Sequence, residues 1–309
     1  MSRSVVVIGN FDGVHRGHQA VVGAALEAAR EAGATARALT FHPHPQEVLG
    51  NGPRPVLTSL ARKRTLLGRA GIGVVVEPFT IELAGLAPEQ FVEHILVRKL
   101  DAECVLVGEN FRFGKGRAGD LDELVRLGAR FGFSARAQAL AGDDAGLFSS
   151  TRVRQALSAG DLASAERCLG RPHSVAGSVR RGDGRGRTIG VPTANLEEIG
   201  EVLPPNGVYA CLVDREVGDA RTEALGLGVA NIGVRPTAAA GFSVEVHLLD
   251  FDQDLYGARL RVHWVERLRS ELKFPSLDAL RAQIERDKDA ARSALSGRKP
   301  QPEAGGAWA

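Results

Sequence analysis

The stretch SVVVIGNFDGVHRGHQAVV, residues 4–22, joins an apolar run to a helical pattern through a turn of glycines and histidines. The run VVVIG (5–9) has the length and composition of a buried strand. Apolar residues then recur at helical spacing as far as Gly33. A strand followed by an amphipathic helix is the repeating unit of a parallel sheet, so the stretch predicts an α/β domain.

The first half of the chain repeats this alternation. Strand, helix and strand in series imply a parallel sheet with right-handed crossovers. Ligands of such sheets bind outside the carboxyl ends of the strands, which is where the GNFDGVHRGH turn lies. The predicted strands cover residues 5–9, 34–41, 73–79, 103–108 and 133–140, and the helical patterns cover 18–33 and 88–100.

The pattern changes near residue 175. Short strands separated by turn residues follow without a long helix, which predicts a small antiparallel barrel or sandwich. A last helix is expected after Pro275, with Ser276 as its N-cap and Leu277, Leu280 and Ile284 on one face. The predicted strands cover 207–214, 224–234, 243–251 and 259–268.

The two halves meet near Arg171-Pro172. Residues 151–170 predict two short helices with a turn at Ala159-Gly160. We therefore expect a first domain over 1–170 and a second over 171–296. The tail 297–309 has no periodicity and is expected to be disordered.

Length and composition limit the function classes. The 309 residues suffice for two ordinary domains, with 44% apolar and 25% charged residues. A net charge of +2 argues against nucleic acid or an anionic membrane as the main partner. No apolar run approaches the ~18 residues that span a bilayer, and no secretory signal is evident. Cys104, Cys168 and Cys211 lie far apart and predict reduced thiols in a cytoplasmic protein.

The turn at 9–18 has the features of a phosphate site. A helix N-terminus offers unpaired N–H groups and the positive end of the dipole. Gly9 allows a sharp exit from the strand, and Gly13 and Gly17 allow a ligand to approach the backbone. His15 and His18 are three residues apart, so they share a face and can donate hydrogen bonds to phosphate.

Two alternatives remain for this turn. A histidine at a helix start can simply cap or pack the helix. A zinc pair is the other alternative, with His42 and His44 of TFHPHP as further ligands. Histidine pairs that bind zinc on a helix are usually four residues apart, as in HExxH, so the spacing favours phosphate.

The segment FSSTRVRQAL offers a second group of polar side chains. Ser149, Ser150 and Thr151 lie just before a predicted helix, where hydroxyl and N–H groups gather. Arg154 follows three residues later, on the side that would face a bound phosphate. The alternative is an ordinary helix cap with a solvated arginine.

A third candidate site combines AGSVRRGDGRGRTIGVPTANL (176–196) with a later strand. Its glycine-rich loop could wrap a diphosphate but is not a Walker A loop. Thr193 and Asn195 share a face of an extended segment and offer oxygen ligands that suit Mg²⁺. Alternation places Glu245 opposite Val244 and Val246, where a carboxylate can accept a proton from an alcohol. The alternatives are a basic surface loop and a solvated strand face.

GNFDGVHRGH resembles the GxFDGxHxGH signature of the nucleotidylyltransferase superfamily. The chain also resembles, more specifically, the N-terminal module of the bifunctional bacterial riboflavin kinase/FAD synthetases. This resemblance rests on GNFDGVHRGH together with TFHPHP, GENFRFGKGRAGD and FSSTRVRQAL. The resemblance implies a Rossmann-like domain that adenylylates FMN with ATP, with His15 and His18 at the triphosphate and Asp12 either holding the turn or near Mg²⁺. Its implied ATP and phosphate ligands are Gly9, Asn10, Phe11, Asp12, Gly13, Gly17, Asn110, Ser149, Ser150, Thr151 and Arg154.

The second half resembles the riboflavin kinase module of the same family. GSVRRGDGRGRTIGVPTANL, PPNGVYA, ANIGVRPT and VEVHLLDFDQDLYG stand in family order, although the turn AAAGFS is shorter than usual. The resemblance implies a β-barrel with a C-terminal helix, Glu245 as the base, and Mg²⁺ on Thr193 and Asn195. Its implied ATP and flavin ligands are Gly182, Gly184, Arg185, Gly186, Arg187, Gly190, Pro192, Asn206, Gly207 and Tyr209.

The sequence therefore predicts a bifunctional transferase. The barrel would phosphorylate riboflavin with ATP and Mg²⁺, and the α/β domain would convert FMN to FAD with release of pyrophosphate. A single-activity enzyme, a flavin-binding sensor on the same folds and a cytidylyltransferase are the alternatives. A sensor would lose Glu245, His15 or His18, and a cytidylyltransferase would not need the barrel.

Overall fold

The computed structural model describes residues 3–52, 55–181, 190–218, 221–234 and 242–298. By their contacts these residues form two compact units. The first unit contains residues up to 52 and Arg62–Ser149, and the second contains Pro55–Ala61 and the residues from Ser150 onward. No helix in the described ranges is both long and apolar enough to cross a membrane.

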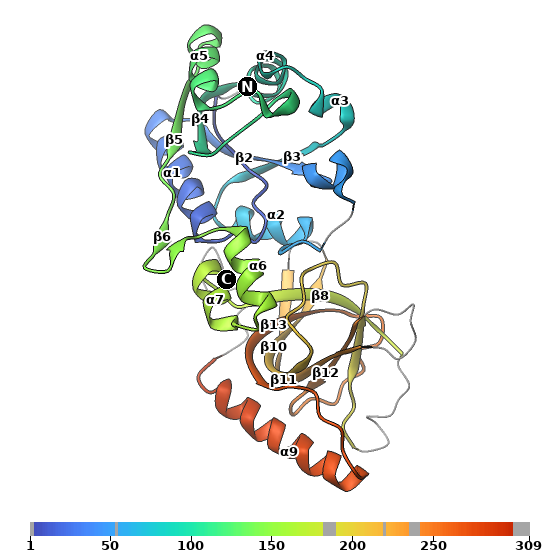
Figure 1. Cartoon of the computed structure of the whole chain (residues 1–309). Coiled ribbons are helices and arrows are strands. Elements are labelled where there is room, and N and C mark those ends of the chain that lie inside the picture. Colours follow the sequence, from blue (N-terminus) through green and yellow to red (C-terminus); the bar gives the residue numbers. More distant parts are fainter. Residues whose placement is uncertain (1–2, 53–54, 182–189, 219–220, 235–241, 299–309) are drawn as a thin grey trace. The chain divides into compact units, whose positions relative to one another are not determined.

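The first unit is built on a five-stranded parallel sheet in the order β3-β2-β1-β4-β5 (Figure 1). All five predicted strands are confirmed. The β-branched runs of β1 and β4 become largely buried strands, as expected where helices cover both faces of a sheet, whereas the edge strands β3 and β5 are only partly buried. The strands are β1 (Ser4–Ile8), β2 (Thr35–His42), β3 (Gly73–Pro78), β4 (Ala102–Gly108) and β5 (Ser134–Gln138).

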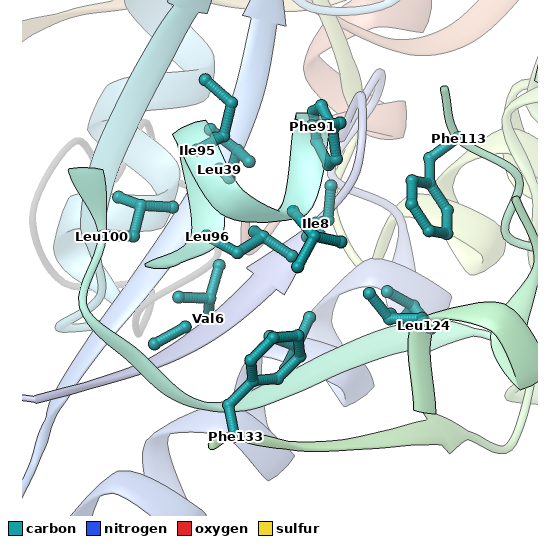
Figure 2. Packing of buried hydrophobic residues seen from close by; sticks show 14 of the residues in the cluster. Val6, Ile8, Leu39, Phe91, Ile95, Leu96, Leu100, Phe113, Leu124 and Phe133 are labelled. Atoms are coloured by element: carbon teal, nitrogen blue, oxygen red, sulfur yellow. The ribbon is translucent and has the colours of Figure 1, made fainter. Parts of the chain in front are cut away.

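Helices cover the two faces of this sheet. Helices α1 (Arg16–Ala32) and α2 (Leu60–Arg69) pack on the face that presents Val5 and Val7. The opposite face packs α4 (Pro88–Phe91), the π-helical segment η2 (Val92–Lys99) and α5 (Leu121–Phe131). Figure 2 shows the second cluster, which includes Val6, Ile8, Leu39, Phe91, Ile95, Leu96, Leu100, Phe113, Leu124 and Phe133.

Short elements complete the first unit. The segment η1 covers Glu47–Asn51, α3 covers Ile81–Ala84 and η3 covers Lys115–Arg117. A small hairpin pairs β6 (Gly142–Asp143) with β7 (Gly146–Leu147).

The second unit contains a closed six-stranded antiparallel barrel in the order β10-β11-β12-β9-β8-β13 (Figure 1). Its interior holds Tyr209, Trp264 and Val246, each no more than 1% exposed. The four predicted strands are confirmed, and two further strands, β8 and β9, complete the closure. The strands are β8 (His173–Arg180), β9 (Ala194–Glu197), β10 (Gly207–Val217), β11 (Arg221–Val234), β12 (Phe242–Leu248) and β13 (Arg259–Arg269).

Among the described residues, three helices belong to the second unit beside the barrel. The predicted pair is present as α6 (Ser150–Ser158) and α7 (Leu162–Leu169). The last helix, α9 (Leu277–Ala294), begins after Ser276, whose hydroxyl accepts the N–H of Ala279 at 3.1 Å. Ala291 of α9 packs against Ala210, Leu212 and Val265 on the outer face of the barrel. The predicted N-cap of this helix is thus confirmed, whereas Leu277 of the predicted apolar face is 62% exposed and the buried residues of α9 are Asp287 and Ala291.

Parts of three predictions lie outside the described residues. They are the glycine-rich loop at 182–189, part of the turn that follows ANIGVRPT, and the tail from 299.

Candidate active sites

The GNFDGVHRGH turn is held against the core by two residues with positive φ. Phe11 has φ 48° and Val14 has φ 42°, and each such conformation costs about 1–3 kcal/mol outside glycine. Both side chains are buried, with 1% and 0% exposure, which offsets that strain. The N–H of Val14 donates to the carbonyl of Phe11 at 3.1 Å. The turn is therefore a fixed platform for the residues that follow it.

His15 is the N-cap of α1. Its Nδ1 accepts the N–H of His18 at 3.4 Å, and the two imidazole rings stack with centroids 3.7 Å apart. Because Nδ1 accepts this hydrogen bond, Nε2 is the ring nitrogen of His15 that can donate one. The predicted pair is thus brought together at the start of a helix, where the dipole favours an anion.

His18 is neutral at pH 7. Burial lowers its pKa well below the usual value, and the charges of His15 and Lys63 lower the pKa further. Its Nδ1 is buried and has no hydrogen-bond partner among the described residues. The edge of the Phe11 ring meets the His18 ring with centroids 5.3 Å apart. A neutral, partly unsatisfied histidine suits a phosphate ligand better than it suits a packing role.

Gly17 is required for a reason that the sequence did not show. A Cβ at this position would lie 2.9 Å from the Phe148 carbonyl oxygen and 3.0 Å from Nδ1 of His15. The glycine therefore makes room for the His15 ring and the Phe148 backbone. Gly13, with φ 86°, has the conformation that favours glycine.

We expect Gly17→Ala to loosen the first turn of α1 by about 1–3 kcal/mol, because an added methyl must displace the His15 ring or the Phe148 backbone. Faster amide hydrogen exchange at His18 would measure this loss. Gly23→Ala is the matched control, since nothing lies within 4 Å of a Cβ there. Unchanged exchange in Gly17→Ala would show that the close approach is unimportant.

The other predicted phosphate ligands fall into two groups. Asn110 is exposed in the turn after β4, which pairs with β1, so both turns lie at the carboxyl edge of the sheet. Thr151 and Arg154 lie in α6 of the second unit, and Arg154 Nη1 donates to the Pro55 carbonyl at 3.0 Å. Asn10 belongs to the histidine turn itself, and its backbone carbonyl accepts a hydrogen bond from Oγ1 of Thr40 at 3.3 Å.

The zinc alternative gains no support from the described residues. Within them, no three His, Cys, Asp or Glu side chains come together as metal ligands. His42 is exposed, and Nδ1 of His44 accepts the N–H of Gln46 at 3.2 Å.

The second site is a polar row on the outer face of the barrel. Glu245 of β12 pairs with Asn195 of β9 on one side and with Asn231 of β11 on the other. Directly paired residues have Cβ atoms about 4.5–5.5 Å apart. Val244 and Val246 face the interior at 1% and 0% exposure, as the alternation predicted. The predicted base and one predicted Mg²⁺ ligand are therefore neighbours.

A pocket of about 360 Å³ opens over this row, between the barrel and α9. Its lining combines apolar side chains with polar and charged ones. A size and lining of this kind suit a small organic ligand. The pocket is lined by Val191, Thr193, Val208, Val229, Asn231, Glu245, His247, Arg269, Glu271, Leu272, Phe274, Leu280, Ile284, Asp287 and Lys288.

His247 connects the row to the PTAN segment. Its Nδ1 donates to the Pro192 carbonyl at 2.8 Å, next to Thr193. Burial lowers the pKa of His247, the largest of several effects, so the ring is neutral at pH 7. His247 is not among the residues predicted from the sequence, although its position two residues after Glu245 places it on the same face of the strand.

The remaining residues predicted for the kinase site lie in several parts of the second unit. Asn206 Nδ2 donates to Oε2 of Glu271, a pocket residue, at 3.4 Å. Gly207 has no room for a side chain, since a Cβ would lie 2.6 Å from the Arg269 carbonyl oxygen. Gly190 forms an exposed turn with φ 80°. The predicted residues Gly182, Gly184, Arg185, Gly186 and Arg187 lie outside the described ranges.

Tyr209 is placed away from the pocket. Its ring is fully buried in the barrel, edge-on to Trp264 with centroids 5.3 Å apart, and its hydroxyl donates to the Pro205 carbonyl. Since β10 turns this side chain inward, the structure gives Tyr209 a packing role rather than the ligand-binding role that was expected.

Comparison with known proteins identifies the family of each half of the chain. A model of the FAD synthetase family matches residues 1–152, and a model of the riboflavin kinase family matches residues 169–295. A bifunctional riboflavin kinase/FMN adenylyltransferase of Escherichia coli strain K12 is 40% identical over 96% of this chain and 94% of its own. The chain belongs to the bifunctional riboflavin kinase/FMN adenylyltransferase family. Both domains are present, so this enzyme makes FMN from riboflavin and FAD from FMN.

Other members of the bifunctional family are similarly close. The Pseudomonas fluorescens protein is 42% identical over 94% of this chain and 92% of its own, and the Bacillus subtilis protein is 38% identical over the same shares. A crystal structure described as a macrolide-efflux protein from Streptococcus pneumoniae is also similar, with a TM-score of 0.82, 32% identity and 94% coverage of both chains. The fold is therefore shared along almost the whole length.

In this member of the bifunctional family, a buried ion pair joins α9 to the pocket wall. Arg269 donates from Nε to Oδ1 of Asp287 at 3.0 Å and from Nη2 to Oδ2 at 2.7 Å. Gln283 Nε2 donates to the same carboxylate at 2.8 Å. The Phe274 ring stacks on the guanidinium, whose carbon lies 5.7 Å from the ring centroid. The pair fixes the helix that closes the pocket.

Asp287→Ala should cost about 3–5 kcal/mol of barrel stability, because it leaves a largely buried Arg269 without its carboxylate. Urea unfolding followed by the fluorescence of Trp264 measures this loss. Asp289→Ala, an exposed change on the same helix, is the control. If the free energy of unfolding falls by less than about 1 kcal/mol, the pair contributes no more than an ordinary surface ion pair, which would contradict this prediction.

Proposed function

We propose that the two activities use the two sites described above. The barrel pocket binds riboflavin and phosphorylates it, and the histidine turn binds ATP for transfer of its adenylyl group to FMN. The single observation that supports this assignment most is the pairing of Glu245, which lines the pocket, with Asn195 of the neighbouring strand.

In the barrel, the apolar side chains of the pocket suit the flat isoalloxazine ring and the polar row suits the ribityl chain. Glu245 accepts the proton of the ribityl 5′-hydroxyl as that oxygen bonds to the γ-phosphorus of ATP. The bond from the γ-phosphorus to the bridging oxygen breaks, and ADP leaves with the electron pair. His247 holds the Pro192 carbonyl and so keeps the Thr193 segment beside this proton transfer.

Thr193 and Asn195 fit a Mg²⁺ site by their chemistry. Both offer neutral oxygen ligands, and Glu245 pairs with Asn195 from the adjacent strand. Mg²⁺ usually keeps several waters and binds substrate phosphates, so two protein ligands suffice. When bound, the ion neutralises charge on the phosphates of ATP.

At the turn, His15 and His18 donate hydrogen bonds to the phosphates of ATP at the start of α1. An oxygen of the FMN phosphate bonds to the α-phosphorus, and pyrophosphate leaves. Such transfers need positioning and charge neutralisation rather than a covalent nucleophile. We assign Asn110, Ser149, Ser150, Thr151 and Arg154 to the phosphates as well.

We further propose that the functional domains are residues 1–170 and 171–296 and that the enzyme acts in the cytoplasm on small molecules, without nucleic acid or membrane partners. The near-neutral net charge of +2 supports this proposal, as do Cys104, Cys168 and Cys211, which form no disulfide.

A chromatographic time course tests the two activities and their metal. Purified enzyme is mixed with riboflavin, ATP and Mg²⁺, and we expect FMN to rise first and FAD to follow. A parallel reaction with EDTA should form neither product. FMN formation that continues in EDTA would contradict the Mg²⁺ assignment, and riboflavin left unchanged in Mg²⁺ would contradict the kinase assignment.

A further inference from the structure

Lys63 is a buried lysine near the histidine turn that the function above does not use. It lies in the first turn of α2 and is only 8% exposed. Leu66 and Leu67, one turn later, pack in the same cluster as Phe11 and Val14 of the histidine turn. Burial of an ammonium group is costly unless an anion compensates it.

The topology places Lys63 at the phosphate edge of the sheet. Helix α2 ends only three residues before β3 begins, so its last turn is at the amino edge and its first turn points toward the carboxyl edge. Helix α1 starts at that same carboxyl edge, directly after β1 and the turn. Both helices cover one face of the sheet. The first turns of α1 and α2 are therefore neighbours.

The ammonium group of Lys63 can accept a bound anion as a partner. No hydrogen bond or ion pair within 4 Å joins the ammonium to another described residue. Asp12, which is also buried, is the carboxylate that favours its charged form, while burial lowers the pKa of Lys63. The positive charge of Lys63 also lowers the pKa of His18 and so favours the neutral form of that ring. Lys63, Asp12 and His18 thus form one electrostatic group.

We propose that Lys63 binds the pyrophosphate part of ATP in the adenylyl-transfer site and stabilises the charge that develops there as pyrophosphate leaves. The bond from the α-phosphorus to the bridging oxygen breaks, and that oxygen keeps the electron pair. Lys63 donates hydrogen bonds to the departing oxygens and keeps its protons. A fixed cation in a site that excludes water stabilises such charge strongly. This inference rests on the proposed function of the histidine turn.

The test compares three variants for FMN-to-FAD conversion. Lys63→Met removes the charge and nearly keeps the volume, and we expect kcat/KM for ATP to fall about 10²–10³-fold. Lys63→Arg should stay within about 10-fold of the wild type, because it restores a cation. Arg64→Met, on the exposed side of the same helix, should change nothing. Riboflavin phosphorylation by the same preparations is the internal control for folded enzyme.

Direct binding separates a ligand role from a structural one. By calorimetry, inorganic pyrophosphate should bind to the wild type and to Lys63→Arg, and at least 10-fold more weakly to Lys63→Met. If Lys63→Met does not fold, Lys63→Gln takes its place, since it keeps a hydrogen-bonding end without the charge. Unchanged pyrophosphate affinity, or a change only in KM for FMN, would overturn the proposal.

His18→Ala distinguishes this inference from the proposed function. If His18→Ala stops FAD formation and Lys63→Met does not, only the inference about Lys63 fails. If FAD formation survives His18→Ala, the assignment of the whole site fails.

Discussion

Glu245→Gln lowers the rate of FMN formation from riboflavin by about 10²–10⁴-fold and leaves the conversion of FMN to FAD unchanged. The amide keeps the shape of the side chain but cannot accept the proton of the ribityl hydroxyl. The backbone pairing with Asn195 and Asn231 stays intact, so the pocket keeps its form. Rates of the two conversions, measured separately by chromatography, give this result.

Glu266→Gln is the matched control, because it changes an exposed carboxylate on another strand of the same barrel. It should leave both rates at the wild-type value. If Glu245→Gln forms FMN at the normal rate, another group removes the proton. If it loses both activities equally, the substitution has damaged more than the kinase site.

His18→Ala has the reverse effect. We expect FAD formation from FMN to fall about 10²–10³-fold, because a neutral donor to the phosphates is lost from the start of α1. The stacked His15 ring also loses its partner, 3.7 Å away. Riboflavin phosphorylation should continue at the wild-type rate, since Glu245 and its pocket belong to the barrel.

His94→Ala is the control for this variant, as His94 is an exposed histidine of η2 in the same unit. Normal FAD formation in His18→Ala would remove the histidine pair from the adenylyl-transfer site. A parallel loss of FMN formation would show that the first unit supports the kinase reaction.

Much of the fold could be predicted because the local signals are strong. The β-branched runs around Val6 and Val105 could only be buried strands, and Ser276 capped the last helix as its position predicted. The barrel strands β8 and β9 were not predicted. The strand β9 is only four residues long and follows a turn, and β8 contains glycine and serine, which weaken the strand signal.

The residues of the two sites could likewise be predicted only in part from the sequence. Motif spacing identified His15, His18 and Glu245, because each lies in a short pattern with a chemical reason. Lys63 lies on a helix too short and too charged to be predicted, and its nearness to His18 depends on the order of three strands. The packing role of Tyr209 depends on which face of β10 is turned inward, and a strand buried on both faces gives no such signal.

The central claim is that one chain carries two separate sites, and mixing two variants tests it most directly. Glu245→Gln and His18→Ala are each incubated alone with riboflavin, ATP and Mg²⁺, and then together. We predict that either variant alone forms FAD at least about 10²-fold more slowly than the wild type and that the mixture restores FAD formation, because His18→Ala supplies FMN that Glu245→Gln adenylylates. FAD formation at the wild-type rate by either variant alone, or a mixture that forms FAD no faster than the single variants, would contradict the account.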